Sequence, residues 1–399
     1  MTFKFPPRDC NWKGDHPTSE DERKEYATRF IAACREKSLD AVAITDHHDI
    51  CYFPYIRAAA AAEVGLDGLP VPDHHRIVVF PGMELTRAVP CQAILILDAD
   101  FPEEHLAALH TVLGVVQNGH NEPIHVQAIR LTDFGSLDKA CEMLDRLDHF
   151  RGRYILLPNV SEGGGSSILR KGFAHHYKNM SCVGGYLDGA VTQLGAGNRG
   201  IVEGRNREYG ERKIGLFQTS DNRNGDFTEL GKHSSWVKWT TPTAEALRQA
   251  CLAHGTRISH ERPACPPMVV SRIEVTDSRF LNEIDLHFNP QYNCLIGGRG
   301  TGKSTILEYL RWALCDQPPT YSDEDDVVPY QEKRSALIDK TLVPVRGVVT
   351  VSFQLNSVMH VVRRSAEMKE LKLKIGTDEF RDCTEQQIRD LLPLQAYSQ

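Results

Sequence analysis

Short apolar runs alternate with longer amphipathic stretches over residues 20–260, and this alternation predicts strands separated by helices. Residues 20–38 place apolar side chains at helical spacing among charged neighbours, which predicts an amphipathic helix. Apolar runs that predict buried strands follow at 39–44, 76–80, 92–97, 154–157 and 214–218. Strands that alternate with helical stretches indicate an α/β fold.

Several of these predicted strands end in acidic or imidazole side chains. The first strand runs directly into Asp46 and His47. The second leads to Glu84, and the last leads to Asp221. Active sites of α/β barrels lie at the carboxyl ends of their strands. We therefore expect an α/β barrel with a metal-type site at one rim.

Beyond residue 268 the pattern predicts paired strands and one clear helix. A short apolar run at 294–296 predicts a buried strand, and apolar positions spaced over 306–314 predict a helix. Runs with apolar and polar alternation predict two further strand pairs, at 269–275 with 283–288 and at 347–354 with 358–363.

Between residue 296 and the predicted helix lies Gly297-x-x-x-x-Gly302-Lys303-Ser304, a complete phosphate-binding loop pattern. Glycines let backbone N–H groups approach phosphate oxygens, and a helix N-terminus adds partial positive charge. Lys303 would reach the β- and γ-phosphates, and Ser304 would hold Mg²⁺. We expect ATP and Mg²⁺ as cofactors, bound by Gly297, Gly298, Gly300, Thr301, Gly302, Lys303, Ser304 and Thr305.

Composition is that of an ordinary globular protein. The 399 residues are 41% hydrophobic and 25% charged, with a net charge of −7. No apolar run approaches the ~20 residues of a membrane helix, so we expect no membrane contact. The 11 cysteines form no Cys-x-x-Cys pair, which favours reduced thiols in a cytoplasmic protein. A proline-rich stretch predicts a linker at 262–269 between domains at 1–261 and 270–399.

Four short motifs stand in a characteristic order: Thr-Asp-His at 45–47, Gly-x-Glu at 82–84, Pro-Asn at 158–159 and Ser-Asp at 220–221. This order resembles the PHP family (polymerase and histidinol phosphatase). With the segments 230–239 and 243–250, the chain is similar to the PHP–ATPase fusions called TrlF-like. The resemblance implies a PHP-type distorted (β/α)7 barrel that hydrolyses phosphoesters with metal ions. The N-terminal lobe of a P-loop, ABC/SMC-like ATPase head would follow.

The sequence departs from the family pattern at several histidines. The family opens with His-x-His, but Phe3 and Phe5 stand at the equivalent start, and phenylalanine cannot coordinate a cation. Asn159 and Arg223 also replace family histidines. By resemblance, the remaining catalytic and metal residues of the barrel are Asp46, His47, Glu84 and Asp221. Such ligands suit Mg²⁺ or Mn²⁺, with Zn²⁺ as a further option.

The C-terminal region resembles the first lobe of SMC-like ATPase heads. By this resemblance Arg279 lies near the phosphates, and Gln399 contacts Mg²⁺ and the attacking water. The sequence shows neither a Leu-Ser-Gly-Gly-type signature nor an apolar strand that ends in Asp-Glu. We therefore expect the second lobe of the head to be missing from this sequence, and hydrolysis to require a homo-oligomer in which two heads meet.

The resemblance implies an ATP-regulated nuclease or phosphoesterase that acts on nucleic acid, with DNA expected rather than RNA. Bacterial fusions of this type are similar to antiphage defence effectors. The alternative is a catalytically dead barrel that serves recognition or oligomerisation and is switched by the ATPase. A small-molecule phosphatase is a third hypothesis, which the incomplete histidine set and the attached ATPase disfavour.

Overall fold

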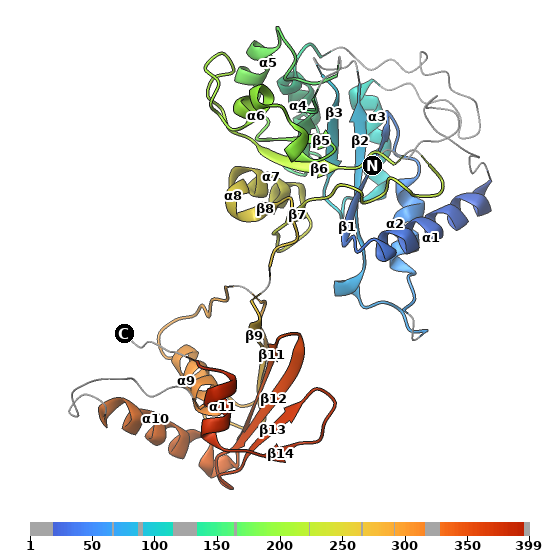
Figure 1. Cartoon of the computed structure of the whole chain (residues 1–399). Helices are drawn as coiled ribbons and strands as arrows, with labels where there is room; N and C mark the ends of the chain where they lie inside the picture. Colours follow the sequence, from blue (N-terminus) through green and yellow to red (C-terminus); the bar gives the residue numbers. More distant parts are fainter. Residues whose placement is uncertain are drawn as a thin grey trace. The chain divides into compact units, whose positions relative to one another are not determined.

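The computed structural model divides the chain into two compact units, Met1–Pro263 and Ala264–Gln399 (Figure 1). Within the described ranges, every helix is too short or too polar to span a lipid bilayer. Phe3, Phe5, Arg223 and Gln399, which the sequence analysis singled out, lie outside these ranges. The structure describes residues 19–65, 68–86, 91–114, 134–162, 166–222, 224–264, 266–290, 292–315 and 328–394.

The N-terminal unit contains a four-stranded sheet, in the order β1-β2-β3-β4. Strand β1 (Ala41–His47) pairs in parallel with β2 (Val78–Leu85). Strands β3 (Ala93–Leu97) and β4 (Tyr154–Pro158) continue the sheet in antiparallel pairings. Both β1 and β2 extend past the ends predicted from the sequence, so Asp46, His47 and Glu84 lie within strands rather than after them.

The antiparallel pairing of β2 with β3 differs from the uniform parallel order of a (β/α) repeat. Its cause is the short connection at 86–92, because a parallel crossover needs roughly a dozen residues or more. A chain this short can only turn back beside the strand that it has left. The barrel itself stays a proposal, since the described ladders do not join β6 to β1.

Strand β5 (Gly184–Asp188) pairs in parallel with β6 (Gly215–Thr219). A single bridge between Asn159 and Tyr186 continues the order from β4 to β5. The sequence analysis missed β5 because its two glycines weaken the apolar pattern. Two short strands, β7 (Trp236–Val237) and β8 (Ile258–Ser259), form a separate antiparallel pair.

Helix α1 (Glu20–Glu36) begins at a capping box. Ser19 Oγ accepts the N–H of Glu22 at 3.2 Å, and Glu22 Oε2 accepts the N–H of Ser19 at 2.9 Å. The buried ring of Phe30 meets Phe227 edge-on, which fixes α1 against the segment after β6. The other helices of this unit are α2 (Phe53–Ala61), α3 (Leu106–Leu113), α4 (Leu137–Asp145), α5 (Ala174–Asn179), α6 (Ala196–Val202), α7 (Ala244–Leu252) and α8 (His254–Arg257).

The C-terminal unit holds a six-stranded antiparallel sheet, in the order β10-β9-β11-β12-β13-β14. Its strands are β9 (Met268–Val275), β10 (Ile284–His287), β11 (Val348–Leu355), β12 (Val358–Ser365), β13 (Leu371–Ile375) and β14 (Arg381–Asp382). Its helices are α9 (Lys303–Ala313), α10 (Val328–Thr341) and α11 (Glu385–Leu391). Because β9 begins at Met268, the linker expected at 262–269 is shorter than predicted.

The expected buried strand at 294–296 is absent from the structure. Residues 292–298 carry no strand, and Ile296 is 93% exposed. A strand in the middle of a sheet is buried by neighbours and by helices on its faces. Among the described residues no strand pairs with this run, so its apolar side chains stay in contact with solvent.

The β5–β6 pair depends on close contact with α7, which leads to a test of the fold. An alanine at Gly215 would place its Cβ 2.5 Å from the Cα of Cys251. We expect Gly215→Ala to destabilise the N-terminal unit by about 1–3 kcal/mol, because backbone atoms cannot yield. Gly255→Ala is the matched control, since nothing lies within 4 Å of its added Cβ. Equal midpoints of chemical denaturation for the two variants would contradict this packing.

Candidate functional sites

The phosphate-loop sequence leads directly into α9, which begins at Lys303. Gly300 and Gly302 have φ angles of +81° and +88°, a left-handed conformation that side chains disfavour. Gly302 is the residue that precedes the first turn of α9. The glycines therefore occur where the backbone requires them, and the helix N-terminus faces the loop as a phosphate site needs.

The turn between β9 and β10 packs on this loop. A Cβ at Gly302 would lie 2.3 Å from Cδ2 of Leu281, so a larger residue there would displace that side chain. Ser278 Oγ accepts the N–H of Leu281 at 3.2 Å and lies 2.8 Å from the Tyr309 hydroxyl. The Tyr309 hydroxyl donates to Thr341 Oγ1 at 2.7 Å. These bonds join the turn to α9 and α10.

Lys303 is bonded to the loop itself. Its Nζ donates to the carbonyl oxygens of Gly297 and Gly298, both at 2.6 Å. Thr301 Oγ1 also donates to the Gly298 carbonyl, at 3.0 Å. An ammonium has three N–H donors, so Lys303 can keep these two carbonyls and still donate to a phosphate. That bond would be strong, because an ionised phosphate accepts stronger hydrogen bonds than a neutral group.

The remaining predicted nucleotide residues fall beside this loop or outside the described ranges. Ser304 and Thr305 lie in the first turn of α9, and Ser304 is exposed. Arg279 is exposed on the turn that packs on Gly302, and its backbone N–H donates to the Thr341 carbonyl at 2.8 Å. The structure thus brings the Arg279 turn to the loop.

In the N-terminal unit, His47 and Glu84 meet across adjacent parallel strands. The register of β1 and β2 pairs these two residues, so their side chains share one face of the sheet. His47 Nδ1 and Glu84 Oε1 are 3.1 Å apart, and both side chains are largely buried. Thr86 Oγ1 donates to Glu84 Oε1 at 3.3 Å. The predicted imidazole and carboxylate therefore form a direct pair.

Asp46 lies on the other face of β1. Successive side chains in a strand alternate, and the register pairs Asp46 with Met83, which belongs to the core beneath α1 and α2. Burial raises the pKa of Tyr26 and of Tyr52, and the nearby Asp46 carboxylate raises both further. The structure therefore does not bring Asp46 to the His47–Glu84 pair.

Asp188 at the end of β5 is a functional candidate that the sequence analysis missed. Thr219 Oγ1 donates to Asp188 Oδ1 at 2.6 Å. The surrounding protein desolvates this carboxyl and raises its pKa, and the charges of Asp221 and Glu84 raise it further. Its side chain remains accessible to solvent, which moderates the effect. An acidic residue that follows the apolar pair Tyr186–Leu187 was the available signal.

The described residues do not complete a metal site around this cluster. Within the described ranges, no three His, Cys, Asp or Glu side chains converge closely enough to hold a metal ion. His47 and Glu84 supply one nitrogen and one carboxylate, whereas a zinc site has about four ligands. Within the described residues the predicted set of Asp46, His47, Glu84 and Asp221 is not gathered into one metal site, and its role as a ligand set remains a prediction.

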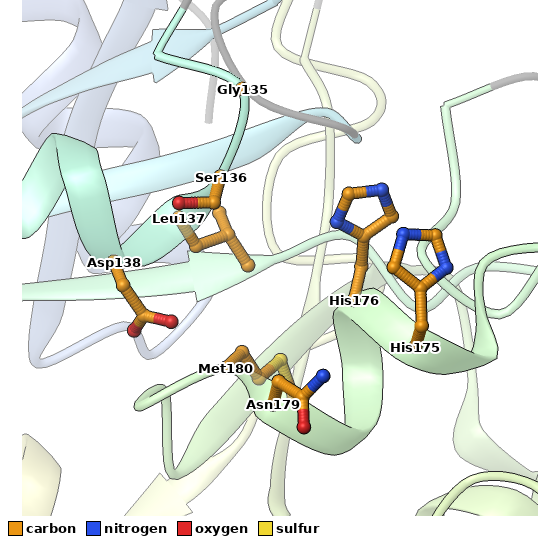
Figure 2. Close-up of a pocket in the computed structure, with 8 residues that line it drawn as sticks. All are labelled: Gly135, Ser136, Leu137, Asp138, His175, His176, Asn179 and Met180. Carbon is orange, nitrogen blue, oxygen red and sulfur yellow. The ribbon is translucent and has the colours of Figure 1, made fainter.

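A separate pocket of about 190 Å³ lies between the start of α4 and α5 (Figure 2). Figure 2 shows His175 and His176 side by side on α5, across from Asp138. Burial lowers the pKa of His176, and the neighbouring His175 lowers it further. Asp138 Oδ1 accepts the N–H of Ser181 at 2.8 Å. None of the predicted site residues is among the described residues that line this pocket.

The interaction between Asp188 and Asp221 can be tested by titration. In Asp221→Asn, one negative charge near Asp188 is removed, so ionisation of Asp188 becomes easier and its pKa should fall. The Asp188 carboxyl carbon, followed by NMR against pH, measures this directly. Asp226→Asn is the matched control, because Asp226 is an exposed carboxylate of the same segment. An unchanged pKa in Asp221→Asn would show that the two carboxylates do not interact.

Comparison with family models places an AAA domain at residues 272–397. Similar curated proteins are the DNA replication and repair protein RecF of Limosilactobacillus reuteri (strain DSM 20016) and of L. reuteri subsp. reuteri (strain JCM 1112). Each is 29% identical over 90 residues, which is 23% of this chain and 24% of the relative. The chain thus matches about a quarter of the length of these relatives.

Two solved structures show remote likenesses. One, from a study of ATP-driven dimerization and DNA-stimulated activation of SMC ATPases, is 15% identical with a TM-score of 0.21. It covers 31% of this chain and 77% of that chain. The other, Endonuclease Q with a duplex that carries an abasic lesion, is 13% identical with a TM-score of 0.39, covering 69% of this chain and 62% of that chain. With TM-scores this low, neither likeness assigns a fold or a function. The family match shows that residues 272–397 of the C-terminal unit are similar to an AAA domain.

Proposed function

We propose that this protein is an ATP-regulated phosphoesterase that acts on nucleic acid. The observation that carries the proposal is the glycine loop that ends in Lys303 at the start of α9, within the region that matches an AAA domain. The loop would hold the triphosphate and Ser304 the Mg²⁺. The RecF relatives are named for DNA replication and repair, which supports DNA as the nucleic acid.

The regulatory part of the proposal rests on the contacts that join the phosphate loop to the β9–β10 turn and to α9. The carbonyls of Gly297 and Gly298 hold Lys303 Nζ in the loop, and its third N–H donor would bind phosphate. The loop also contacts Leu281, whose turn is bonded to Tyr309 of α9. We propose that nucleotide binding changes the position of this turn and, through it, of α9 and α10. We propose that two such heads pair around ATP, which makes the active protein a homo-oligomer.

The catalytic part of the proposal concerns the N-terminal unit. His47, Glu84, Asp188 and Asp221 lie at the carboxyl ends of β1, β2, β5 and β6, where α/β enzymes place their catalytic groups. The His47–Glu84 pair has the geometry to hold or move a proton at His47 Nδ1. By resemblance to PHP–ATPase fusions, the substrate would be foreign nucleic acid in bacterial antiphage defence.

A second function is favoured by the incomplete ligand set. Because the described residues present one imidazole and one carboxylate in contact, the N-terminal unit would recognise a partner or assemble copies without cleaving anything. In this case ATP binding remains the switch, while Glu84 has no catalytic task. The two functions therefore differ in what a substitution at Glu84 does.

The nucleotide claim is tested by Lys303→Ala. Loss of the ammonium removes a charged hydrogen bond to phosphate, so affinity for Mg²⁺–ATP should fall at least about tenfold. Isothermal titration calorimetry on the whole chain measures this. Lys340→Ala is the matched control, because Lys340 is an exposed lysine of α10 outside the loop. Equal ATP affinity in the wild type and Lys303→Ala would contradict the proposal.

The cleavage claim is tested by Glu84→Gln in a nuclease assay with Mn²⁺ and DNA. If Glu84 takes part in proton transfer, the rate should fall by roughly a hundredfold or more. Glu208→Gln, at an exposed position of the same unit, should leave the rate unchanged. Cleavage that survives in Glu84→Gln overturns the catalytic role. Wild-type protein that binds DNA without cleaving it supports the second function instead.

A further inference from the structure

The phosphate loop carries a second cation that the pattern does not require. Residues 292–305 contain Arg299 and Lys303 and no aspartate or glutamate. Arg299 is exposed. In the described part of the chain, no hydrogen bond or ion pair is formed by its guanidinium. A loop with two cations and no acidic residue is suited to a ligand with several negative charges.

Several other arginines of the same unit are held by carboxylates. Arg272 lies 2.6 Å from Asp285, and Arg311 lies 3.1 Å from Glu308. The charges of these two arginines are therefore already engaged by carboxylates within the unit. Arg299 differs from them because it lies within the loop and no carboxylate of the described residues pairs with it. Within these residues, a bound ligand would break no ion pair to reach its charge.

The position of Arg299 follows from the bonds of Lys303. Lys303 Nζ lies on the carbonyls of Gly297 and Gly298, and Arg299 is the next residue along the chain. Consecutive Cα atoms are about 3.8 Å apart, so the Arg299 backbone lies close to the place of this ammonium. The lysine of such a loop serves the β- and γ-phosphates. Arg299 therefore projects from the part of the loop that is nearest to the outer phosphates.

We propose that Arg299 contacts the γ-phosphate of bound ATP and lets the loop distinguish ATP from ADP. A guanidinium can donate two parallel N–H bonds to phosphate oxygens, so this contact selects a terminal phosphate by geometry as well as by charge. Lys303 also reaches the β-phosphate, which both nucleotides carry, whereas Arg299 acts only on the γ-phosphate, which ATP alone carries. This inference rests on the proposed ATP-binding function.

The experiment compares ATP and ADP affinities of the full chain by calorimetry, with a non-hydrolysable ATP analogue as a second ligand. Arg299→Ala should weaken ATP and analogue binding roughly tenfold to a hundredfold and leave ADP binding within about threefold. Arg299→Lys should recover part of the loss, because it restores charge without the planar fork. Arg363→Ala, an exposed arginine of β12, is the control that should change neither affinity.

Two failures are distinguishable. If the wild type binds ATP and Lys303→Ala does not, but Arg299→Ala weakens ATP and ADP equally or weakens neither, the role of Arg299 is overturned and the nucleotide site stands. If the wild type binds no nucleotide, both the proposed function and the role of Arg299 are overturned. Equal denaturation midpoints for wild type and Arg299→Ala ensure that a loss of affinity is a local effect.

Discussion

The contact between Leu281 and the bare Cα of Gly302 is the constraint on which the C-terminal unit depends. It places the turn after β9 directly on the loop, and a Cβ at Gly302 would collide with the leucine at 2.3 Å. The left-handed φ of +88° at the same residue excludes side chains for a second reason. The leucine contact and the left-handed backbone both occur at the residue before α9. A phosphate bound by the loop would lie at this helix N-terminus.

Hydrogen-bonded hydroxyl groups, two of them buried, connect this turn to the rest of the unit. Ser278, Tyr309 and Thr341 are joined by bonds of 2.8 and 2.7 Å, and they link the turn, α9 and α10. Because Tyr309 is fully buried, breaking this chain would leave polar groups without water. The turn that covers the loop is therefore connected directly to two helices.

Local patterns predicted the elements that depend on short-range signals. The helix after Lys303, strands β9 and β10, and the β11–β12 hairpin follow from spacing and glycine placement. The strand expected at 294–296 failed because strand formation needs partners, and apolar character alone cannot show whether a neighbouring strand exists. The antiparallel β2–β3 pairing was missed because pairing direction depends on the connection at 86–92, which the apolar pattern ignores.

In the N-terminal unit, local sequence patterns predicted some residues of the candidate site correctly and misplaced others. His47 and Glu84 were predicted together, and the parallel register brings them to 3.1 Å. Asp46 was grouped with them because the strand was expected to end at residue 44. Since β1 continues to His47, alternation turns Asp46 to the opposite face, beside Met83. Asp188 was missed because the glycines of β5 hid the strand that it ends.

The most direct test of the central claim is a structure of the whole chain with Mg²⁺ and a non-hydrolysable ATP analogue. The account predicts that Lys303 Nζ contacts the β- and γ-phosphates, with Leu281 still in contact with Gly302. A nucleotide bound elsewhere, with no phosphate in contact with Lys303, would contradict it.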